Sequence, residues 1–114
     1  DYITVLDLKT TAQFDAFKYR VFRNHYDLQC ATYSVIAAAT QGRNLQADMD
    51  FVKYVFCVAE TVPPYRVQYM CVNQEFVNHG IDKLNTCLAA IKEFGDRKPN
   101  FLIEDWVELG DLSY

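Results

Sequence analysis

The fold follows from one stretch near the start of the chain, Ile3-Thr4-Val5-Leu6-Asp7-Leu8-Lys9-Thr10-Thr11. Its β-branched and apolar residues favour a strand, and its two closing threonines suit a turn. Because side chains alternate faces along a strand, Asp7 and Lys9 share one face, whereas Leu6 and Leu8 lie on the other. The predicted strand therefore ends with two opposite charges on the same side.

This charge pair has two interpretations from the residues alone. A carboxylate and an ammonium group placed side by side can hold a divalent cation and a reacting phosphate. The plainer interpretation is an exposed ion pair at a strand end, which would contribute little to stability.

A short amphipathic helix is predicted next. The range Gln13–Phe22 has apolar residues at helical spacing, and its polar side carries Lys18, Arg20 and Arg23. These basic residues form either a solvated face or a contact surface for a nucleic-acid backbone beside the strand end.

The following range, His25–Thr40, is a stronger helix because it is rich in alanine and is closed by a glycine. Tyr26, Gln29 and Tyr33 lie on one stripe of it. The stripe is polar and follows a strand that carries an acid and a lysine. Tyr26 and Gln29 are therefore expected to point towards that charge pair, and Tyr33 is expected to pack.

Strands and a further helix are predicted in the second half of the chain. After a polar loop, Phe51–Glu60 is apolar on both faces, which predicts a central strand. Pro63-Pro64 interrupts the ladder, and Tyr65–Val72 is predicted to return as the second strand of a hairpin. An amphipathic packing helix is predicted from Asn73 to Gly95.

This order predicts an α/β fold with a mixed central sheet flanked by helices, in one domain spanning residues 1–114. The crossover from Leu6 to Val55 favours a parallel strand pair, and the hairpin adds an antiparallel one. The tail Phe101–Leu109 is expected to add an edge strand, with Trp106 covering the core. An aromatic content of 15% and an apolar content of 51% argue against wholesale disorder.

Composition also narrows the functional classes. No apolar run approaches the ~20 residues of a membrane span and no signal-peptide pattern is present, so a cytoplasmic protein without a membrane partner is predicted. The net charge of −4 argues against a chain whose whole surface binds nucleic acid. The widely spaced cysteines are predicted to be buried reduced thiols and not a zinc site: Cys30, Cys57, Cys71 and Cys87.

Three stretches resemble the PD-(D/E)xK nuclease superfamily. Asp7-Leu8-Lys9 is similar to its acid-x-lysine motif. The stretch from Tyr26 to Tyr33 resembles the tyrosine-x-x-glutamine signature of the branch that contains the RecE-type and lambda-exonuclease-like exonucleases of phages and prophages. The stretch from Phe56 to Tyr65 resembles the strand and Pro-Tyr turn of that branch. The resemblance covers most of the chain and implies a restriction-endonuclease-like core.

The resemblance implies a role for each motif residue. Asp7 and the carbonyl of Leu8 would bind Mg²⁺, with Mn²⁺ as a substitute. Lys9 would orient the attacking water or stabilise the transition state. Gln29 would fix the lysine or the scissile phosphate, with Tyr26 beside it. The residues expected to contact DNA are Thr10, Thr11, Lys18 and Arg23.

The implied activity is magnesium-dependent digestion of one strand of double-stranded DNA, 5′ to 3′, for recombination by single-strand annealing. A homo-oligomeric ring and a single-strand annealing protein are the implied partners. Two alternatives stay open: a non-catalytic interaction module that retains the nuclease fold, and an unrelated small α/β binding domain.

The chain departs from the family at one point. The family's site uses another acidic ligand on a strand farther upstream, and the chain begins close to Asp7. The chain therefore resembles the C-terminal half of a nuclease domain, incomplete at the N-terminus. Residues before Asp1 are expected to carry the missing acid, and residues 1–114 alone are expected to bind Mg²⁺ weakly and to have little activity. Glu60 is the first candidate for a ligand within the chain.

Overall fold

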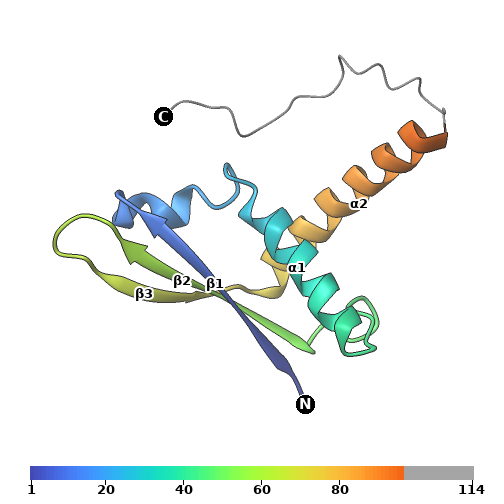
Figure 1. Ribbon diagram of the computed structural model, residues 1–114, viewed down its shortest axis with the longest axis horizontal. Helices are drawn as coiled ribbons and strands as arrows, with labels where there is room; N and C mark the ends of the chain where they lie inside the picture. Colours follow the sequence, from blue (N-terminus) through green and yellow to red (C-terminus); the bar gives the residue numbers. More distant parts are fainter. Residues whose placement is uncertain (97–114) are drawn as a thin grey trace, which may run out of the picture.

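The computed structural model describes residues 1–96 (Figure 1). Its elements, in chain order, are strand β1 (Ile3–Thr11), 3-10 helix η1 (Phe14–Tyr19), helix α1 (Tyr26–Thr40), strand β2 (Val52–Glu60), strand β3 (Val67–Cys71) and helix α2 (Gln74–Asp96). The predicted α/β class and the predicted order of the elements are confirmed.

The three strands form one mixed sheet in the order β1-β2-β3. β1 and β2 are parallel, with Asp7 opposite Phe56, and β2 and β3 are antiparallel, with Cys57 opposite Tyr69. The first pair is parallel because α1 carries the chain back across the sheet. The second pair is antiparallel because the Pro63-Pro64 turn reverses the chain. The predicted mixed sheet with β2 at its centre is confirmed.

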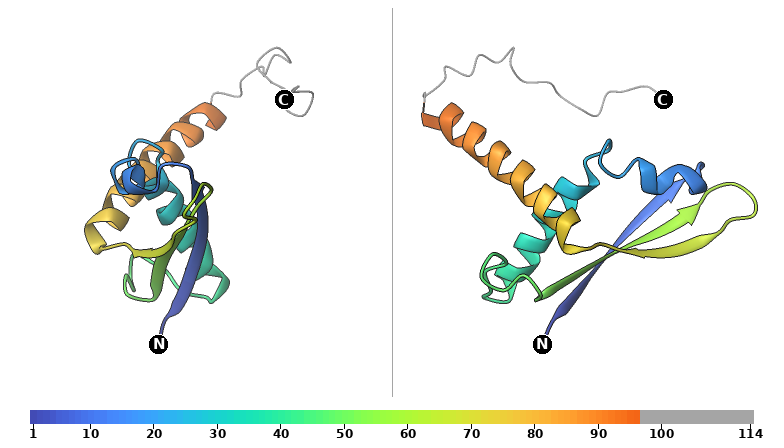
Figure 2. Two further views of the ribbon diagram at one scale, coloured as in Figure 1. Left: turned by 90° about the vertical axis from the view of Figure 1, so that its left-hand side faces the viewer. Right: turned by 180° about the vertical axis from the view of Figure 1, so that it is seen from behind.

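The two faces of the sheet have different surroundings. Helices cover one face, as the left view of Figure 2 shows. The buried core on that face consists of Phe17, Cys30, Tyr54, Phe56 and Val58. On the opposite face the large side chains of Leu6, Leu8 and Tyr69 are exposed. The predicted flanking helices therefore cover only one face of the sheet within residues 1–96.

Helices α1 and α2 approach each other closely at Gly80. A Cβ atom at this position would lie 2.0 Å from the carbonyl oxygen of Asp27, so a larger residue would push the two helices apart. Farther along, α2 projects away from the sheet (Figure 1), and its Leu88 and Ile91 side chains are exposed. The predicted packing helix thus packs against α1 along its first half, and the described side chains beyond Leu84 are exposed.

Two predicted boundaries shift for local reasons. The range Gln13–Phe22 contains a 3-10 helix and not an α-helix, and its tighter repeat suits the spacing of Phe14 and Phe17. Tyr65 has a φ angle of +59°, which a strand does not allow, so β3 begins at Val67. The tail Phe101–Leu109 and its Trp106 lie outside the described residues.

All four cysteines are free thiols, and the prediction that they are buried holds only in part. Cys30 is buried, whereas Cys71 and Cys87 are exposed because they lie on the uncovered sheet face and on the projecting part of α2. Within residues 1–96, every helix is too short or too polar to traverse a lipid bilayer.

Candidate functional site

The candidate site begins near the end of β1. Asp7 and Lys9 point to the helix-covered face, and Lys9 Nζ lies 3.3 Å from Asp7 Oδ1. The Lys9 and Asp7 side chains are only 14% and 11% exposed, respectively. The shared face was predicted correctly from the alternation of the strand. The alternative of an exposed surface pair is wrong, because α1 covers both groups.

Helix α1 brings two further predicted residues to Lys9. The ammonium group donates a hydrogen bond to Gln29 Oε1 and lies 4.4 Å from the centre of the Tyr26 ring. Tyr26 and Gln29 are three residues apart in the first turns of α1, so their side chains emerge on the same side. The structure therefore brings together Asp7, Lys9, Tyr26 and Gln29, which we call the lysine cluster.

Tyr33 extends the lysine cluster by one turn of α1. Gln29 Nε2 donates a hydrogen bond to Tyr33 Oη at 3.3 Å, and the Tyr33 side chain is 44% exposed. The expectation that Tyr33 is a packing residue is therefore wrong, because the side chain is largely exposed and bonds to Gln29. Because its oxygen accepts a hydrogen bond from the amide, its own hydroxyl proton remains available to donate to a ligand.

The sequence reasoning missed Tyr54, which approaches the lysine cluster from β2. Its hydroxyl donates a hydrogen bond to Asp7 Oδ2 at 2.5 Å, and the residue is 3% exposed. Burial raises the pKa of Tyr54 above its usual value, and the hydrogen bond to Asp7 raises it further. The phenol therefore remains a protonated donor. The only signal in the sequence is a hydroxyl at an inward position of a central strand.

Cys30 lies in the core beneath the lysine cluster. Burial raises the pKa of its thiol to about 12, an effect that a hydrogen bond to Ser34 opposes and the nearby carboxylate of Asp7 reinforces. A thiol with this pKa stays protonated at neutral pH and is a poor nucleophile. Cys30 therefore acts as a packing residue.

The donor atoms around Asp7 suit a hard cation only in part. Each Asp7 oxygen keeps a lone pair after its contact with Tyr54 or Lys9. The backbone groups of Ile3 and Thr11 form hydrogen bonds on the side of β1 that faces β2. Leu8 is an odd number of residues from both, so its carbonyl points to the side of β1 that faces away from β2. One carboxylate and one carbonyl fit Mg²⁺ that keeps several waters. Residues 1–96 contain no group of three or more His, Cys, Asp or Glu residues arranged to hold a metal.

Glu60 does not complete this donor set. It lies four residues beyond Phe56, the partner of Asp7, which places it about 13 Å farther along the sheet. Arg66 holds its buried carboxylate at 2.9 Å and lowers its pKa by donating hydrogen bonds to it. Arg66 also contacts Asp15 and lies over the ring of Phe14. Glu60 therefore ties the hairpin turn to η1.

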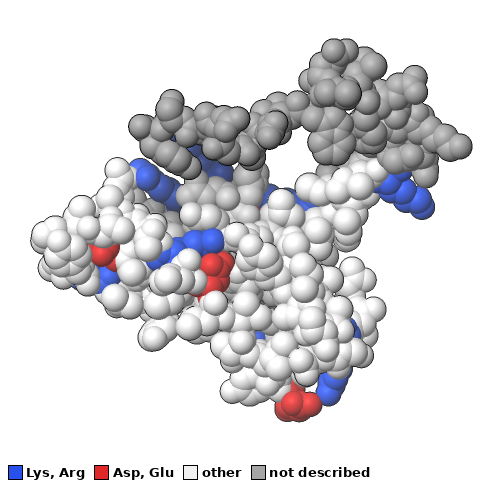
Figure 3. Space-filling view, in the orientation of Figure 1, with Lys and Arg blue, Asp and Glu red and all other residues white. Residues whose placement is uncertain are grey.

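The residues expected to contact DNA do not gather at the lysine cluster. Thr10 points to the uncovered face of the sheet, and the hydroxyl of Thr11 accepts a hydrogen bond from the backbone of Gln13. Lys18 lines a hollow beside β3, and Arg23 is exposed before α1. On the face drawn in Figure 3, Lys and Arg side chains form several separate patches.

A hollow of about 310 Å³ lies on the outer side of α1, next to the lysine cluster. Tyr26, Gln29 and Tyr33 belong both to its wall and to the network around Lys9. A ligand in this hollow would therefore meet the exposed hydroxyl of Tyr33 and the amide that contacts Lys9.

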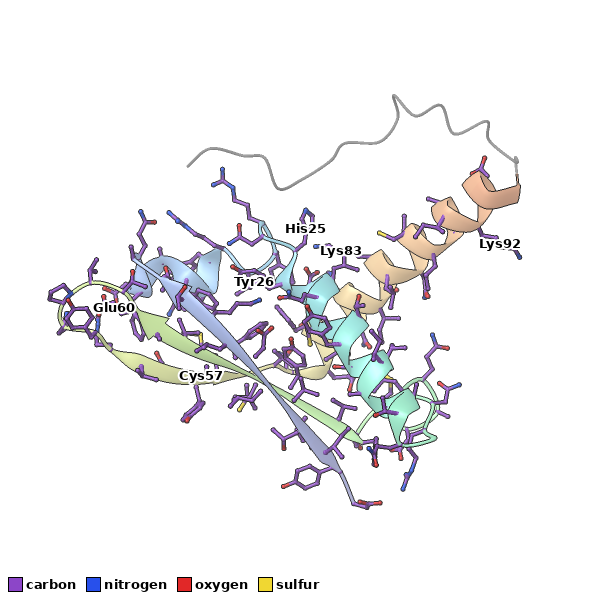
Figure 4. All side chains as sticks on the ribbon, in the orientation of Figure 1. His25, Tyr26, Cys57, Glu60, Lys83 and Lys92 are labelled. Atoms are coloured by element: carbon purple, nitrogen blue, oxygen red, sulfur yellow. The ribbon has the colours of Figure 1, made fainter. Side chains whose placement is uncertain are left out.

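A second carboxylate–lysine pair lies on another side of α1. Lys83 Nζ from α2 lies 2.9 Å from Asp27, which is completely buried, and 3.3 Å from His25 Nδ1. Figure 4 shows His25, Tyr26 and Lys83 near the start of α1, and Glu60 at the distant end of the sheet. We call Asp27 and Lys83 the helix pair, because they join α1 to α2.

Comparisons with known proteins assign no family to the chain. No family model and no curated protein matches the chain.

Proposed function

We propose that the chain is part of a metal-dependent deoxyribonuclease of the PD-(D/E)xK superfamily, with a restriction-endonuclease-like core. The observation that supports this proposal is the position of Lys9, which contacts Asp7 and Gln29 and lies over the Tyr26 ring. These are the four residues to which the resemblance assigns the chemistry. They come from two elements about twenty positions apart, and the fold brings them into contact.

In this proposal the chain's own residues position the reacting groups. Asp7 and the Leu8 carbonyl would hold Mg²⁺ or Mn²⁺, which when bound activates water and offsets charge on the phosphate. Lys9 presents its ammonium to the scissile phosphate, where charge develops during cleavage. Gln29 and the Tyr26 ring restrict the lysine to one direction, so less rotamer freedom is lost when substrate binds.

The proposed substrate is linear double-stranded DNA, digested on one strand from its 5′ end. The proposed setting is recombination by single-strand annealing in the cytoplasm, with a homo-oligomeric ring and an annealing protein as partners. Lys18 and Arg23 remain proposed contacts to the DNA backbone away from the lysine cluster, because both are exposed on the segment that joins β1 to α1.

One observation supports a second candidate, a DNA-interaction module without catalysis. Within residues 1–96, Asp7 is the only carboxylate in contact with Lys9. A single carboxylate binds Mg²⁺ weakly unless substrate phosphates or other ligands complete the site.

Nuclease assays of the full-length natural protein test the proposal. The protein is incubated with linear duplex DNA labelled at either the 5′ or the 3′ end, with Mg²⁺, with Mn²⁺ and with chelator. We expect metal-dependent release of labelled mononucleotides from the 5′ end, and no loss of covalently closed circular DNA. DNA binding without metal-dependent cleavage would contradict the proposal and support the second candidate.

A further inference from the structure

One polar contact to the lysine cluster is made by a residue to which the resemblance gives no role, Tyr54. Tyr54 lies on β2 opposite Val5, and its side chain faces the helix-covered core. From there the hydroxyl reaches along β1 to Asp7 Oδ2, at 2.5 Å. The contact joins the central strand of the sheet to the acid of the acid-x-lysine motif.

The hydroxyl of Tyr54 is not needed to fill the core. The ring packs edge-on against the ring of Phe56, with a centroid distance of 5.3 Å, and a phenylalanine ring would make the same contact. A buried hydroxyl without a partner is unfavourable, because it loses its hydrogen bonds to water. Asp7 is the partner that the structure shows for this hydroxyl.

Tyr54 and Lys9 hold the two oxygens of Asp7 separately. The phenol occupies Oδ2, and the ammonium lies 3.3 Å from Oδ1. A carboxylate held at both oxygens cannot rotate freely about its Cβ–Cγ bond. Each oxygen still has a lone pair that neither neighbour uses. The lone pairs that could bind a cation are therefore fixed in direction before the cation arrives.

We propose that Tyr54 is a positioning residue that orients the Asp7 carboxylate for a divalent cation. This inference rests on the proposed function, because it assigns the cation to Asp7. Residues that orient a metal ligand through a hydrogen bond contribute about 10-fold or more to metal affinity. Tyr54 acts through Asp7 and does not itself touch the cation or the substrate.

The test compares two deletions of a single oxygen atom in the full-length natural protein. Tyr54→Phe removes the hydroxyl that contacts Asp7. Tyr69→Phe is the matched control, because Tyr69 lies on β3 on the uncovered sheet face and is 65% exposed. Mn²⁺ binding is measured by electron paramagnetic resonance, and folding is checked by circular dichroism. We expect Tyr54→Phe to bind Mn²⁺ about 10-fold more weakly and Tyr69→Phe to bind it as the wild type does.

Wild-type affinity in a folded Tyr54→Phe protein would overturn the inference. A second measurement needs no variant: Mg²⁺ titrated into the wild-type protein should shift the ring NMR signals of Tyr54 and leave those of Tyr69 in place. Unchanged Tyr54 signals at saturating Mg²⁺ would also overturn the inference.

Asp7→Asn separates this inference from the proposed function. If Asp7→Asn abolishes Mn²⁺ binding and Tyr54→Phe leaves it unchanged, only the role of Tyr54 is wrong. If Asp7→Asn binds Mn²⁺ as the wild type does, the metal site itself is wrong, and the inference fails with it.

Discussion

Two carboxylate–lysine pairs lie on different sides of helix α1. In the lysine cluster, Asp7 and Lys9 contact an amide and two phenol-bearing side chains, and both charges are partly accessible. In the helix pair, Asp27 is fully buried beside the close approach of α1 and α2 at Gly80. The ion-pair contacts are of similar length, 3.3 Å and 2.9 Å. The pair alone therefore does not distinguish a candidate site from a packing contact; the surrounding groups do.

The surroundings decide what each lysine can do. Lys9 lies on β1, the outermost strand of the sheet within residues 1–96, and its partners Gln29 and Tyr26 line a hollow along α1. Lys83 lies between two helices and neutralises a carboxylate that is inaccessible to a substrate. We expect variants of the lysine cluster to change activity and variants of the helix pair to change stability.

The largest effect, on the free energy of unfolding, is expected from Gly80→Ala, because this substitution places a methyl group in the contact between α1 and α2. The added Cβ would lie 2.0 Å from the backbone oxygen of Asp27, so α1 and α2 must separate. We expect a loss of about 3 kcal/mol or more in the free energy of unfolding. Urea denaturation measures this loss. Asn85→Ala, at an exposed position of α2, is the control and should change stability by less than about 0.5 kcal/mol.

The next largest effect is expected from Lys9→Ala, measured as the rate of DNA cleavage by the full-length protein. Loss of a group that stabilises charge in the transition state costs on the order of 10²-fold or more. We expect the fold to remain, because Asp7 keeps its hydrogen bond from Tyr54 when the ammonium group is removed. A folded Lys9→Ala variant that cleaves at the wild-type rate would contradict the catalytic role of Lys9, which is what distinguishes it from Lys83 in this proposal.

Local sequence patterns predicted the elements and the face of each charge. Alternation in β1 placed Asp7 and Lys9 together, and the spacing of Tyr26 and Gln29 placed them on one side of α1. Both predictions concern neighbours within one element, where the geometry repeats regularly. The contact of Lys9 with Gln29 could be predicted because only a short segment, which contains η1, separates β1 from α1.

The role of Tyr54 could not be predicted in this way. Its contact with Asp7 spans 47 residues and depends on the register between β1 and β2, which no local pattern specifies. The same reason applies to Asp27 and Lys83, which are 56 residues apart. Glu60 was considered a possible ligand because it ends the neighbouring strand, but its partner Arg66 lies across a turn whose geometry the sequence did not reveal.

Lys83→Met should have an intermediate effect, on stability alone. Methionine keeps most of the side-chain volume but leaves the buried carboxylate of Asp27 without its cation. Breaking a fully buried pair costs about 3–5 kcal/mol, and we expect about 2 kcal/mol here because Lys83 is partly exposed. The cleavage rate per folded molecule should not change. Lys92→Met, farther along α2, is the matched control and should leave both quantities unchanged.

The smallest effect is expected at Glu60, a third carboxylate–cation contact. Arg66 lowers the pKa of Glu60 below its usual value of 4.5 in the folded protein. The contact therefore stabilises the fold at pH values above 4.5, and this contribution is lost as the pH falls through the lower, folded-state pKa. We expect Glu60→Gln to be less stable than wild type at pH 7, and the difference to be smaller at pH 4, below the usual pKa of the carboxyl group. Chemical denaturation at both pH values measures it, and a pH-independent difference would contradict the assignment.

The most direct test compares the two aspartates in one assay. Asp7→Asn and Asp27→Asn make the same chemical change, the first in the lysine cluster and the second in the helix pair. For each folded full-length variant, the rate of magnesium-dependent cleavage of linear duplex DNA is measured. We expect Asp7→Asn to reduce the rate by about 10²-fold or more and Asp27→Asn to retain the wild-type rate per folded molecule while unfolding at lower urea concentration. Wild-type cleavage by folded Asp7→Asn would contradict the assignment of the lysine cluster as a nuclease site.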